Sequence, residues 1–325
     1  MTHAIRVHEP GGPEQMRWET VEVPAPGAGE ATVRHTAVGL NYIDVYHRTG
    51  AYPSKERPYG IGVEAAGVVE AVGEGVTRVS SGDRVAYVAQ PPGSYSEKRN
   101  VAADRLVRLP DGIDDKTAAA MMLKGMTAQY LLRRTYKVLP GNTILVHAAA
   151  GGVGLILCQW AKQLGATVIG TVGSDEKAKL VKSHGCDYPV VYTREDFVER
   201  VKDVTDGAGV HVVYDSVGKD TFMKSLDCLR RFGMGVLFGL SSGPVPPFDV
   251  SLLGPKGSLF ITRPTLFHYT ADVQDLDHSA AELFEVVQKK AVKIEINQTY
   301  PLPEAARAHQ DLEARKTTGS TILLP

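Results

Sequence analysis

The chain has 325 residues, which is too many for one ordinary domain and about right for two. Hydrophobic residues make up 43% and charged residues 22%, which provides for a sizeable core and excludes a disordered or coiled-coil protein. Lys and Arg number 36 against 37 for Asp and Glu, so no global field holds nucleic acid or an anionic membrane, although a local basic patch remains open.

Short alternating runs broken by Gly and Pro characterise residues 1–110. They predict strands at 31–35, 65–72 and 84–88, with turns between them such as PAPG (24–27) and SGD (81–83). Regularly spaced turns between short strands are typical of a compact antiparallel barrel or sandwich.

From residue 117 the pattern changes. Residues 117–137 lack Pro and carry Ala, Met and Leu at helical spacing, so they predict a helix. Apolar strand-like runs then alternate with helical segments, which predicts a parallel, doubly wound sheet with strands at 143–147, 167–172, 189–192, 210–215, 236–239 and 259–262. The last segment, 263–325, predicts helices at 279–290 and 303–315 and a strand at 320–324, and we expect it to fold back on the first domain.

Cysteine usage and hydropathy bear on the compartment. The three cysteines, Cys158, Cys186 and Cys228, are odd in number and form no CxxC pair, which argues for a reducing compartment and excludes Cys-rich zinc modules. The N-terminus has no apolar h-region, and no apolar stretch approaches the ~18 residues of a membrane span. The sequence therefore predicts a soluble, cytoplasmic protein.

The segment 143–155, TILVHAAAGGVGL, places an apolar strand before a glycine turn that opens a helix. A dinucleotide pyrophosphate needs backbone N–H groups at a helix N-terminus and side chains small enough for close approach. Gly151, Gly152 and Gly154 meet this need, and Val153 begins the helix face directed at the sheet. Ala149 replaces the first Gly of the GxGxxG pattern, but the strand–turn–helix context still predicts a dinucleotide site. The alternative is a turn used only for close helix packing.

The residues at the end of the following strand should determine whether NAD or NADP is the cofactor. NAD sites place Asp or Glu there, whereas this strand ends in Thr171-Val172-Gly173-Ser174. Ser174 can donate a hydrogen bond to a 2′-phosphate, Lys177 can supply charge, and Tyr192 could close the pocket, so we expect NADPH rather than NADH. A second interpretation, compatible with the first, is that Ser174 is a helix N-cap, Asp175 and Glu176 favour the helix dipole, and Lys177 is a solvated helix residue.

Seven motifs together resemble the medium-chain dehydrogenase/reductase superfamily, and more closely its zeta-crystallin-type quinone oxidoreductases. They are GLNYID (39–44), GVEAAG (62–67), GDRV (82–85), KGMTA (124–128), HAAAGGVG (147–154), DSVG (215–218) and FGLSSG (238–243). The resemblance spans the chain and implies an α/β protein with a Rossmann-type doubly wound parallel sheet and a GroES-like, mainly antiparallel β-barrel. It implies a GroES-like catalytic domain at 1–123, a Rossmann NADP-binding domain at 124–262 and a return segment at 263–325, assembled as a homodimer. The last parallel strand, 259–262, supports the dimer independently, because it would otherwise present an unpaired apolar edge.

Zinc alcohol dehydrogenases of this superfamily carry a Cys near the position of Asn41 and a His at that of Val63. With no thiolate in residues 1–157, a cysteine-ligated catalytic zinc cannot be built, so we expect a metal-independent enzyme. Asp44 and His47 could be imagined as ligands, but a third is not evident. Without a metal to stabilise an alkoxide, reduction of a quinone or activated enone is favoured over oxidation of an alcohol, because the product oxyanion is already delocalised.

The resemblance also implies the site residues. The equivalents of Asn41, Tyr46 and Tyr52 line the nicotinamide and substrate site in the family, and Tyr42 lies in the same stretch. The alternative is that the tyrosines only pack a loop against the barrel. Further family contacts carry over to this set of residues: Thr127, Tyr130, Ser216, Phe238, Gly239, Ser241, Arg263 and, facing the 2′-phosphate, Arg315.

The leading hypothesis is thus a zinc-independent, NADPH-dependent reductase that transfers a hydride to quinones. A reductase of other α,β-unsaturated carbonyls or of enoyl thioesters is the nearest alternative. A cofactor-bound, RNA-binding or structural crystallin-like protein is a second alternative, although the near-zero charge argues against nucleic acid as main partner.

Overall fold

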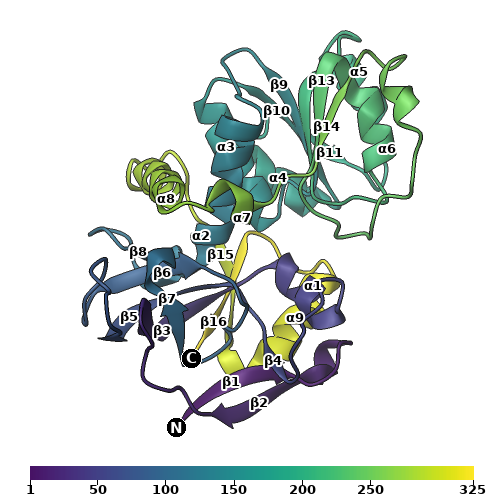
Figure 1. Cartoon of the computed structure of the whole chain (residues 1–325). Coiled ribbons are helices and arrows are strands. Elements are labelled where there is room, and N and C mark those ends of the chain that lie inside the picture. Colours follow the sequence, from purple (N-terminus) through teal and green to yellow (C-terminus); the bar gives the residue numbers. More distant parts are fainter. The chain divides into compact units, whose positions relative to one another are not determined.

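The computed structural model describes all 325 residues, which fold into two compact units (Figure 1). The first comprises Met1–Met126, Asp272–Gln288 and Ile294–Pro325, and the second comprises Thr127–Ala271 and Lys289–Lys293. None of the helices is both long enough and apolar enough to cross a bilayer.

The first unit contains two sheets. The larger has seven strands in the order β15-β16-β3-β5-β6-β8, with β7 also pairing with β3. Its strands are β3 (Glu30–Leu40), β5 (Glu64–Val72), β6 (Arg84–Val88), β7 (Lys98–Ala102), β8 (Leu106–Arg108), β15 (Ile296–Pro301) and β16 (Ser320–Leu324). All pairs are antiparallel except β15 with β16. The smaller sheet joins β1 (Thr2–Val7), β2 (Met16–Val21) and β4 (Tyr59–Gly60) in the order β2-β1-β4.

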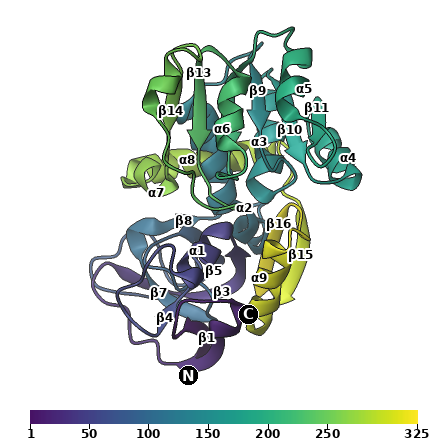
Figure 2. The same cartoon turned by 90° about the vertical axis from the view of Figure 1, so that its right-hand side faces the viewer.

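Strand β3 organises this unit because it pairs with β5, β7 and β16. Its register with β5 shifts twice, and such bulges bend a strand. A Cβ on Gly67 of β5 would lie 2.0 Å from the carbonyl oxygen of Arg34, so the two strands approach closely only with glycine there. Three helices complete the unit, α1 (Tyr42–Thr49), α8 (Val273–Gln288) and α9 (Ala305–Glu313), and α2 (Asp115–Tyr130) begins in it. Helix α9 lies beside β15 and β16 (Figure 2).

The second unit is a six-stranded parallel sheet in the order β11-β10-β9-β12-β13-β14. Its strands are β9 (Thr143–Val146), β10 (Thr167–Val172), β11 (Tyr188–Val191), β12 (Val210–Asp215), β13 (Leu229–Leu237) and β14 (Phe260–Thr262). Helices α3 (Gly152–Gln163), α4 (Asp175–Ser183), α5 (Phe197–Val204) and α6 (Phe222–Ser225) flank this sheet, and α7 (Leu266–Tyr269) follows β14 (Figure 1). The strand order reverses between β9 and β12, and ligands of open α/β sheets bind at the carboxyl ends of strands at such a point.

The predicted fold class is confirmed, and the bounds of individual elements differ in two informative places. The helix predicted at 117–137 ends as an α-helix at Tyr130 and continues as a π-helix over Leu131–Thr135. Strand β13 begins at Leu229, well before the predicted residue 236, because exposed Arg230 and Arg231 interrupt the apolar run of the sequence. Its pairing with β12 is irregular over the same stretch, between Leu229 and Met234.

Candidate functional site

The turn between β9 and α3 lets a ligand approach the backbone closely. Gly151 is the N-cap of α3, and the first turn of this helix has neither a side-chain cap nor an acidic residue. The N–H groups of Gly152 and Val153, the first residues of α3, thus lie at an N-terminus suited to an anion. A Cβ on Gly154 would lie 2.5 Å from the carbonyl oxygen of Ala148, so no larger residue fits. These features fit a dinucleotide pyrophosphate.

His147 ties the strand ends around this turn together, a role that the sequence analysis missed. Its Nδ1 lies 3.0 Å from Thr171 Oγ1 at the end of β10, and its Nε2 lies 2.9 Å from Ser225 Oγ on α6. The ring is fully enclosed and meets Phe197 edge-on at 4.9 Å between centroids. Burial lowers the pKa of His147, against the opposing effect of Asp215, so the neutral ring acts as a fixed two-sided bridge.

Gly173, Ser174, Lys177 and Tyr192, all predicted to bind a 2′-phosphate, follow the ends of β10 and β11. The hydroxyl of Tyr192 would lie 2.9 Å from a Cβ on Gly173, so the structure brings these two residues together. Ser174 Oγ accepts a hydrogen bond from the Lys177 backbone at 3.3 Å, so Ser174 is the N-cap of α4, and its predicted contact with a 2′-phosphate stays a prediction. Hydrogen bonds lower the pKa of the Glu176 carboxyl, first from its own backbone N–H and to a smaller extent from the Ser174 hydroxyl.

The carboxyl ends of β12 and β13 bring together four further predicted residues. The Phe238 N–H donates to the Asp215 carbonyl at 2.8 Å, and the Ser241 N–H donates to the Ser216 carbonyl at 3.1 Å. A Cβ on Gly239 would lie 2.7 Å from that same Ser216 oxygen. The structure therefore brings Ser216, Phe238, Gly239 and Ser241 together at the ends of these strands.

Tyr130, at the end of α2, lies face to face with Tyr269, with ring centroids 4.3 Å apart and an interplanar angle of 9°. Thr127 is buried one turn earlier on α2. Burial and Tyr269 raise the pKa of the Tyr130 phenol, whereas Arg263, just after β14, lowers it. Tyr130 therefore stays a neutral hydrogen-bond donor, and the structure brings Arg263 within electrostatic reach of it.

In the first unit, Asn41 caps α1 and is held by a buried ion pair. Its Nδ2 donates to Glu64 Oε2 at 2.7 Å, and the Leu123 N–H donates to Glu64 Oε1 at 2.7 Å. Lys124 Nζ lies 3.6 Å from Glu64 Oε2 and donates to the Leu40 carbonyl at 3.1 Å. Burial raises the pKa of Glu64, and Lys124 opposes this. Because the amide N–H₂ of Asn41 is directed at Glu64, the orientation of the Asn41 side chain is fixed.

The predicted tyrosine cluster is present on and after α1. Tyr42 and Tyr46 lie 5.4 Å apart between ring centroids, and Tyr46 and Tyr52 lie 5.2 Å apart. All three are half-buried. Burial and Glu313 raise the pKa of Tyr42, and Arg315, which follows α9, lowers it. The structure thus brings Arg315 within reach of Tyr42, and the three phenols form one partly exposed aromatic surface.

A second buried polar cluster lies behind α1. Asp44 Oδ2 accepts hydrogen bonds from the Asn41 N–H and the Tyr95 hydroxyl, both at 2.9 Å. Tyr95 also lies 3.1 Å from His309 Nε2, while Arg48, only 1% exposed, donates to Glu313 at 2.7 and 2.8 Å. Burial raises the pKa of Asp44 to about 7. The cluster fixes α1, and with it the tyrosines, from the inside of the unit.

No group of three or more His, Cys, Asp or Glu side chains is placed to hold a metal ion. The Asp44 carboxylate already accepts hydrogen bonds from the Asn41 N–H and the Tyr95 hydroxyl. The His47 ring lies against the Tyr52 ring, with centroids 5.7 Å apart. Metal independence stays a prediction, which rests on Asn41 and Val63 at the ligand positions.

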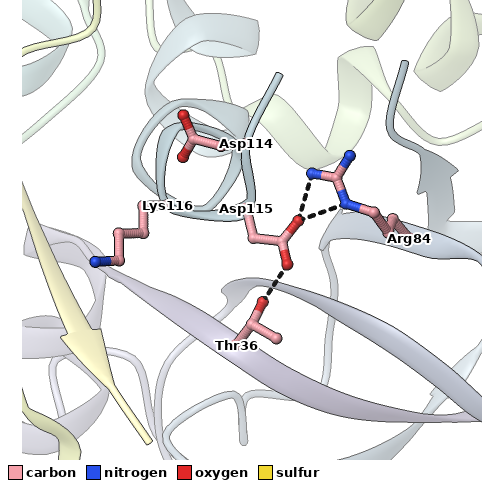
Figure 3. Close-up of a pocket in the computed structure, with 5 residues that line it drawn as sticks. All are labelled: Thr36, Arg84, Asp114, Asp115 and Lys116. Carbon is pink, nitrogen blue, oxygen red and sulfur yellow. Dashed lines mark hydrogen bonds and ion pairs between the residues drawn. The ribbon is translucent and has the colours of Figure 1, made fainter. Parts of the chain in front are cut away.

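An open hollow on the first unit is lined by Thr36, Arg84, Asp114, Asp115 and Lys116 (Figure 3). Arg84 donates to Asp115 Oδ1 from Nε at 2.9 Å and from Nη2 at 2.6 Å, and Thr36 donates to Asp115 Oδ2 at 2.7 Å. The central charges of the hollow thus satisfy each other, and none of the predicted site residues lines it.

Two family descriptions match the chain: "Alcohol dehydrogenase GroES-like domain" over residues 27–143 and "Zinc-binding dehydrogenase" over residues 152–276. A quinone oxidoreductase of Pseudomonas aeruginosa is 52% identical over 325 residues, covering 100% of both chains. This chain belongs to the quinone oxidoreductase family. The predicted membership in the medium-chain dehydrogenase/reductase superfamily is thereby confirmed.

Two further relatives are similar to this chain over nearly its whole length. The solved structure of Escherichia coli quinone oxidoreductase complexed with NADPH is 46% identical and superposes with a TM-score of 0.98, covering 99% of this chain and 100% of that chain. A 2-haloacrylate reductase from Burkholderia is 47% identical over 331 residues, covering 100% of this chain and 99% of that protein.

Proposed function

We propose that this chain is an NADPH-dependent reductase that transfers a hydride to quinones. The observation that carries the proposal is the near-complete superposition, at a TM-score of 0.98, on a quinone oxidoreductase complexed with NADPH. The uncapped glycine turn of α3 and the strand tip at Gly173 and Ser174, which has no carboxylate, support it from the chain's own residues.

The residues of the second unit fit the cofactor. The backbone N–H groups of Gly152 and Val153 would hold its pyrophosphate at the N-terminus of α3, next to the N-cap Gly151. Lys177 would neutralise the 2′-phosphate, which Tyr192 would flank. The strand-end set Ser216, Phe238, Gly239 and Ser241, with Thr127, Tyr130 and Arg263, belongs to the same proposal. Arg315 belongs to the first unit, and its contact with the 2′-phosphate stays a prediction. NADPH supplies the hydride when bound, and the protein supplies its orientation.

The substrate side of the proposal rests on the first unit. Tyr46 and Tyr52 present phenol donors on an aromatic surface, on which a flat quinone can stack. Asn41, oriented by Glu64, would serve as a further polar contact. A quinone oxyanion is delocalised, so hydrogen bonds are sufficient to stabilise it and no metal is required. The proton can then come from water, and neither tyrosine has to be an essential acid.

Reduction of α,β-unsaturated acids is a second candidate function. The 47% identity to a 2-haloacrylate reductase over the whole chain favours it. The same donors would serve, because an enolate oxyanion is also delocalised.

The assembly belongs to the same proposal. Strand β14 ends the parallel sheet, and Phe260 on it is 55% exposed. Phe232, Val250 and Leu252 are also exposed apolar residues of the segments around β13 and β14. An apolar strand edge of this kind is suited to pairing with a second copy, so we propose a homodimer. Sedimentation equilibrium at micromolar concentration should show twice the 35.0 kDa chain mass, and a monomer would contradict it.

The location of the protein is part of the same proposal. All three cysteines are free thiols, which supports a reducing, cytoplasmic location.

Steady-state oxidation of NADPH and NADH, each with 1,4-benzoquinone and with 2-chloroacrylate, tests the function. We expect quinone reduction with a preference for NADPH. Lys177→Ala should lower kcat/KM for NADPH by about tenfold or more and leave that for NADH nearly unchanged, because one charge-assisted hydrogen bond is lost. Lys182→Ala, in the last turn of the same helix, is the matched control. Equal use of the two cofactors, or no reaction with any acceptor, would contradict the proposal.

A further inference from the structure

The residue after Ser174 is an aspartate, and the structure shows what holds it. Arg194 Nη1 donates to Asp175 Oδ2 at 2.8 Å, and Arg194 Nη2 donates to Asp175 Oδ1 at 2.6 Å. Arg194 is in the turn that follows β11, where its backbone N–H donates to the Val191 carbonyl at 3.0 Å. A planar fork of two parallel hydrogen bonds fixes both partners more firmly than a single contact does.

The position of this pair matters because of what flanks it. Asp175 is the first residue of α4, next to the N-cap Ser174, and Tyr192 precedes Arg194 in the same turn. These are the residues to which the proposed function assigns the 2′-phosphate. A phosphate carries about two negative charges at neutral pH, so an uncompensated carboxylate at this turn would oppose it.

The local charges are finely balanced. The anions near this turn are Asp175, Glu176 and Glu195, and the Glu195 carboxylate lies 3.9 Å from Arg194 Nε. The bidentate pair of Arg194 is with Asp175, so without Arg194 the Asp175 carboxylate would lose the cation that binds both of its oxygens. Charges this close interact within a Debye length of about 8 to 10 Å, even at physiological salt. The Arg194 guanidinium also lowers the pKa of Asp175, which agrees with a direct pair.

We propose that Arg194 is a specificity-determining residue that makes the site selective for 2′-phosphorylated dinucleotides by neutralising Asp175. It acts through Asp175 and does not bind the phosphate itself. The proposal rests on the proposed function, since it assumes that the cofactor binds at the ends of β10 and β11. It explains how a chain with a carboxylate one residue beyond the strand tip can still favour NADPH.

The test is a double-mutant cycle with binding as the first readout. Isothermal titration gives the Kd of NADPH, NADH and 2′,5′-ADP for the wild type, Arg194→Ala, Asp175→Asn and the double variant. Arg194→Ala should weaken NADPH and 2′,5′-ADP about two- to fivefold, the size expected for an exposed charge pair, and leave NADH unchanged. The double variant should regain most of the lost affinity, because the carboxylate that Arg194 neutralised is gone.

Lys202→Ala is the matched control, because Lys202 also pairs with an exposed carboxylate, Glu199, at 2.8 Å. It removes the same charge from α5 and should leave all three Kd values unchanged. The effect of Arg194→Ala should also shrink as salt is raised.

Each remaining outcome decides the question. If Arg194→Ala leaves the ratio of the two dinucleotide affinities unchanged while the wild type reduces quinones with NADPH, the role of Arg194 is overturned and the function stands. If Asp175→Asn fails to rescue Arg194→Ala, Arg194 contacts the phosphate directly and neutralisation is overturned. If the wild type binds NADPH selectively but reduces no acceptor, the function fails and the role of Arg194 is still decided by the binding cycle. A wild type that binds both dinucleotides equally overturns both proposals.

Discussion

Replacing Asp44 with Asn should remove a pH dependence from the stability of the first unit. Asp44 is fully buried, and desolvation raises its pKa to about 7, despite hydrogen bonds from Asn41 and Tyr95 that favour the carboxylate. Its Oδ2 accepts both bonds, whereas Oδ1 has no partner. An Asn side chain can therefore keep both bonds with its amide oxygen, and it mimics the neutral acid.

The sign and size follow from linkage. An unfolded Asp titrates near 3.9, so between about pH 4 and pH 7 the folded protein binds more protons than the unfolded chain, and stability falls as pH rises. From pH 5 to pH 8, the ionisation of Asp44 should cost the wild type about 2 to 3 kcal/mol of unfolding free energy. His35 and His309, whose pKa values burial lowers to about 4 and about 3, act in the opposite direction. Both are present in the two proteins, so their effect cancels in the comparison.

Urea unfolding of wild type and Asp44→Asn at several pH values gives the difference directly. The variant should gain stability relative to wild type between pH 5 and about pH 7, by about the amount above, and the difference should level off towards pH 8. A difference that stays constant across this range would refute the reasoning, because Asp44 would then be ionised throughout.

Three further predictions concern the site. Gly154→Ala should abolish dinucleotide binding and destabilise the second unit by about 1 to 3 kcal/mol, since its Cβ would meet the Ala148 carbonyl at 2.5 Å; titration with NADPH and thermal unfolding measure the two effects. Tyr46→Phe and Tyr52→Phe should each raise KM for the quinone and lower kcat less than about tenfold, and a loss of many orders of magnitude in kcat would instead identify a required general acid. Elemental analysis should find no stoichiometric zinc and a chelator should leave activity intact, whereas one zinc per chain with chelator-sensitive activity would reverse the assignment.

The parts of the fold that the sequence predicts best are buried strands. Strands β6, β10, β12 and β16 have the predicted bounds, because runs of apolar residues between turn signals leave little choice of register. The end of α2 was harder, since the helical pattern continues unbroken from Tyr130 into the π-helix. Periodicity over a few residues does not distinguish the two helix types.

The same contrast holds for the site. Glycine turns are visible in the sequence because their chemistry is local, as at Gly151 and Gly154. The polar bridges are not, because their partners are distant: Asn41 bonds to Glu64, 23 residues away, and His147 reaches Ser225, 78 residues away. A polar residue directly after a buried strand, such as His147, is the one local signal that could have indicated a bridge.

Backbone and side chains carry different parts of the proposed cofactor recognition. The pyrophosphate turn is made of main-chain N–H groups and glycines packed against carbonyl oxygens, so a substitution there disturbs binding and fold together. The 2′-phosphate end is made of half-buried or exposed side chains, including Lys177, Tyr192 and Arg194, whose removal leaves the sheet untouched. Variants of this second group should therefore change the choice between NADPH and NADH while retaining NADH binding and thermal stability. We therefore expect that substituting these surface side chains can exchange the cofactor preference without rebuilding the pyrophosphate turn.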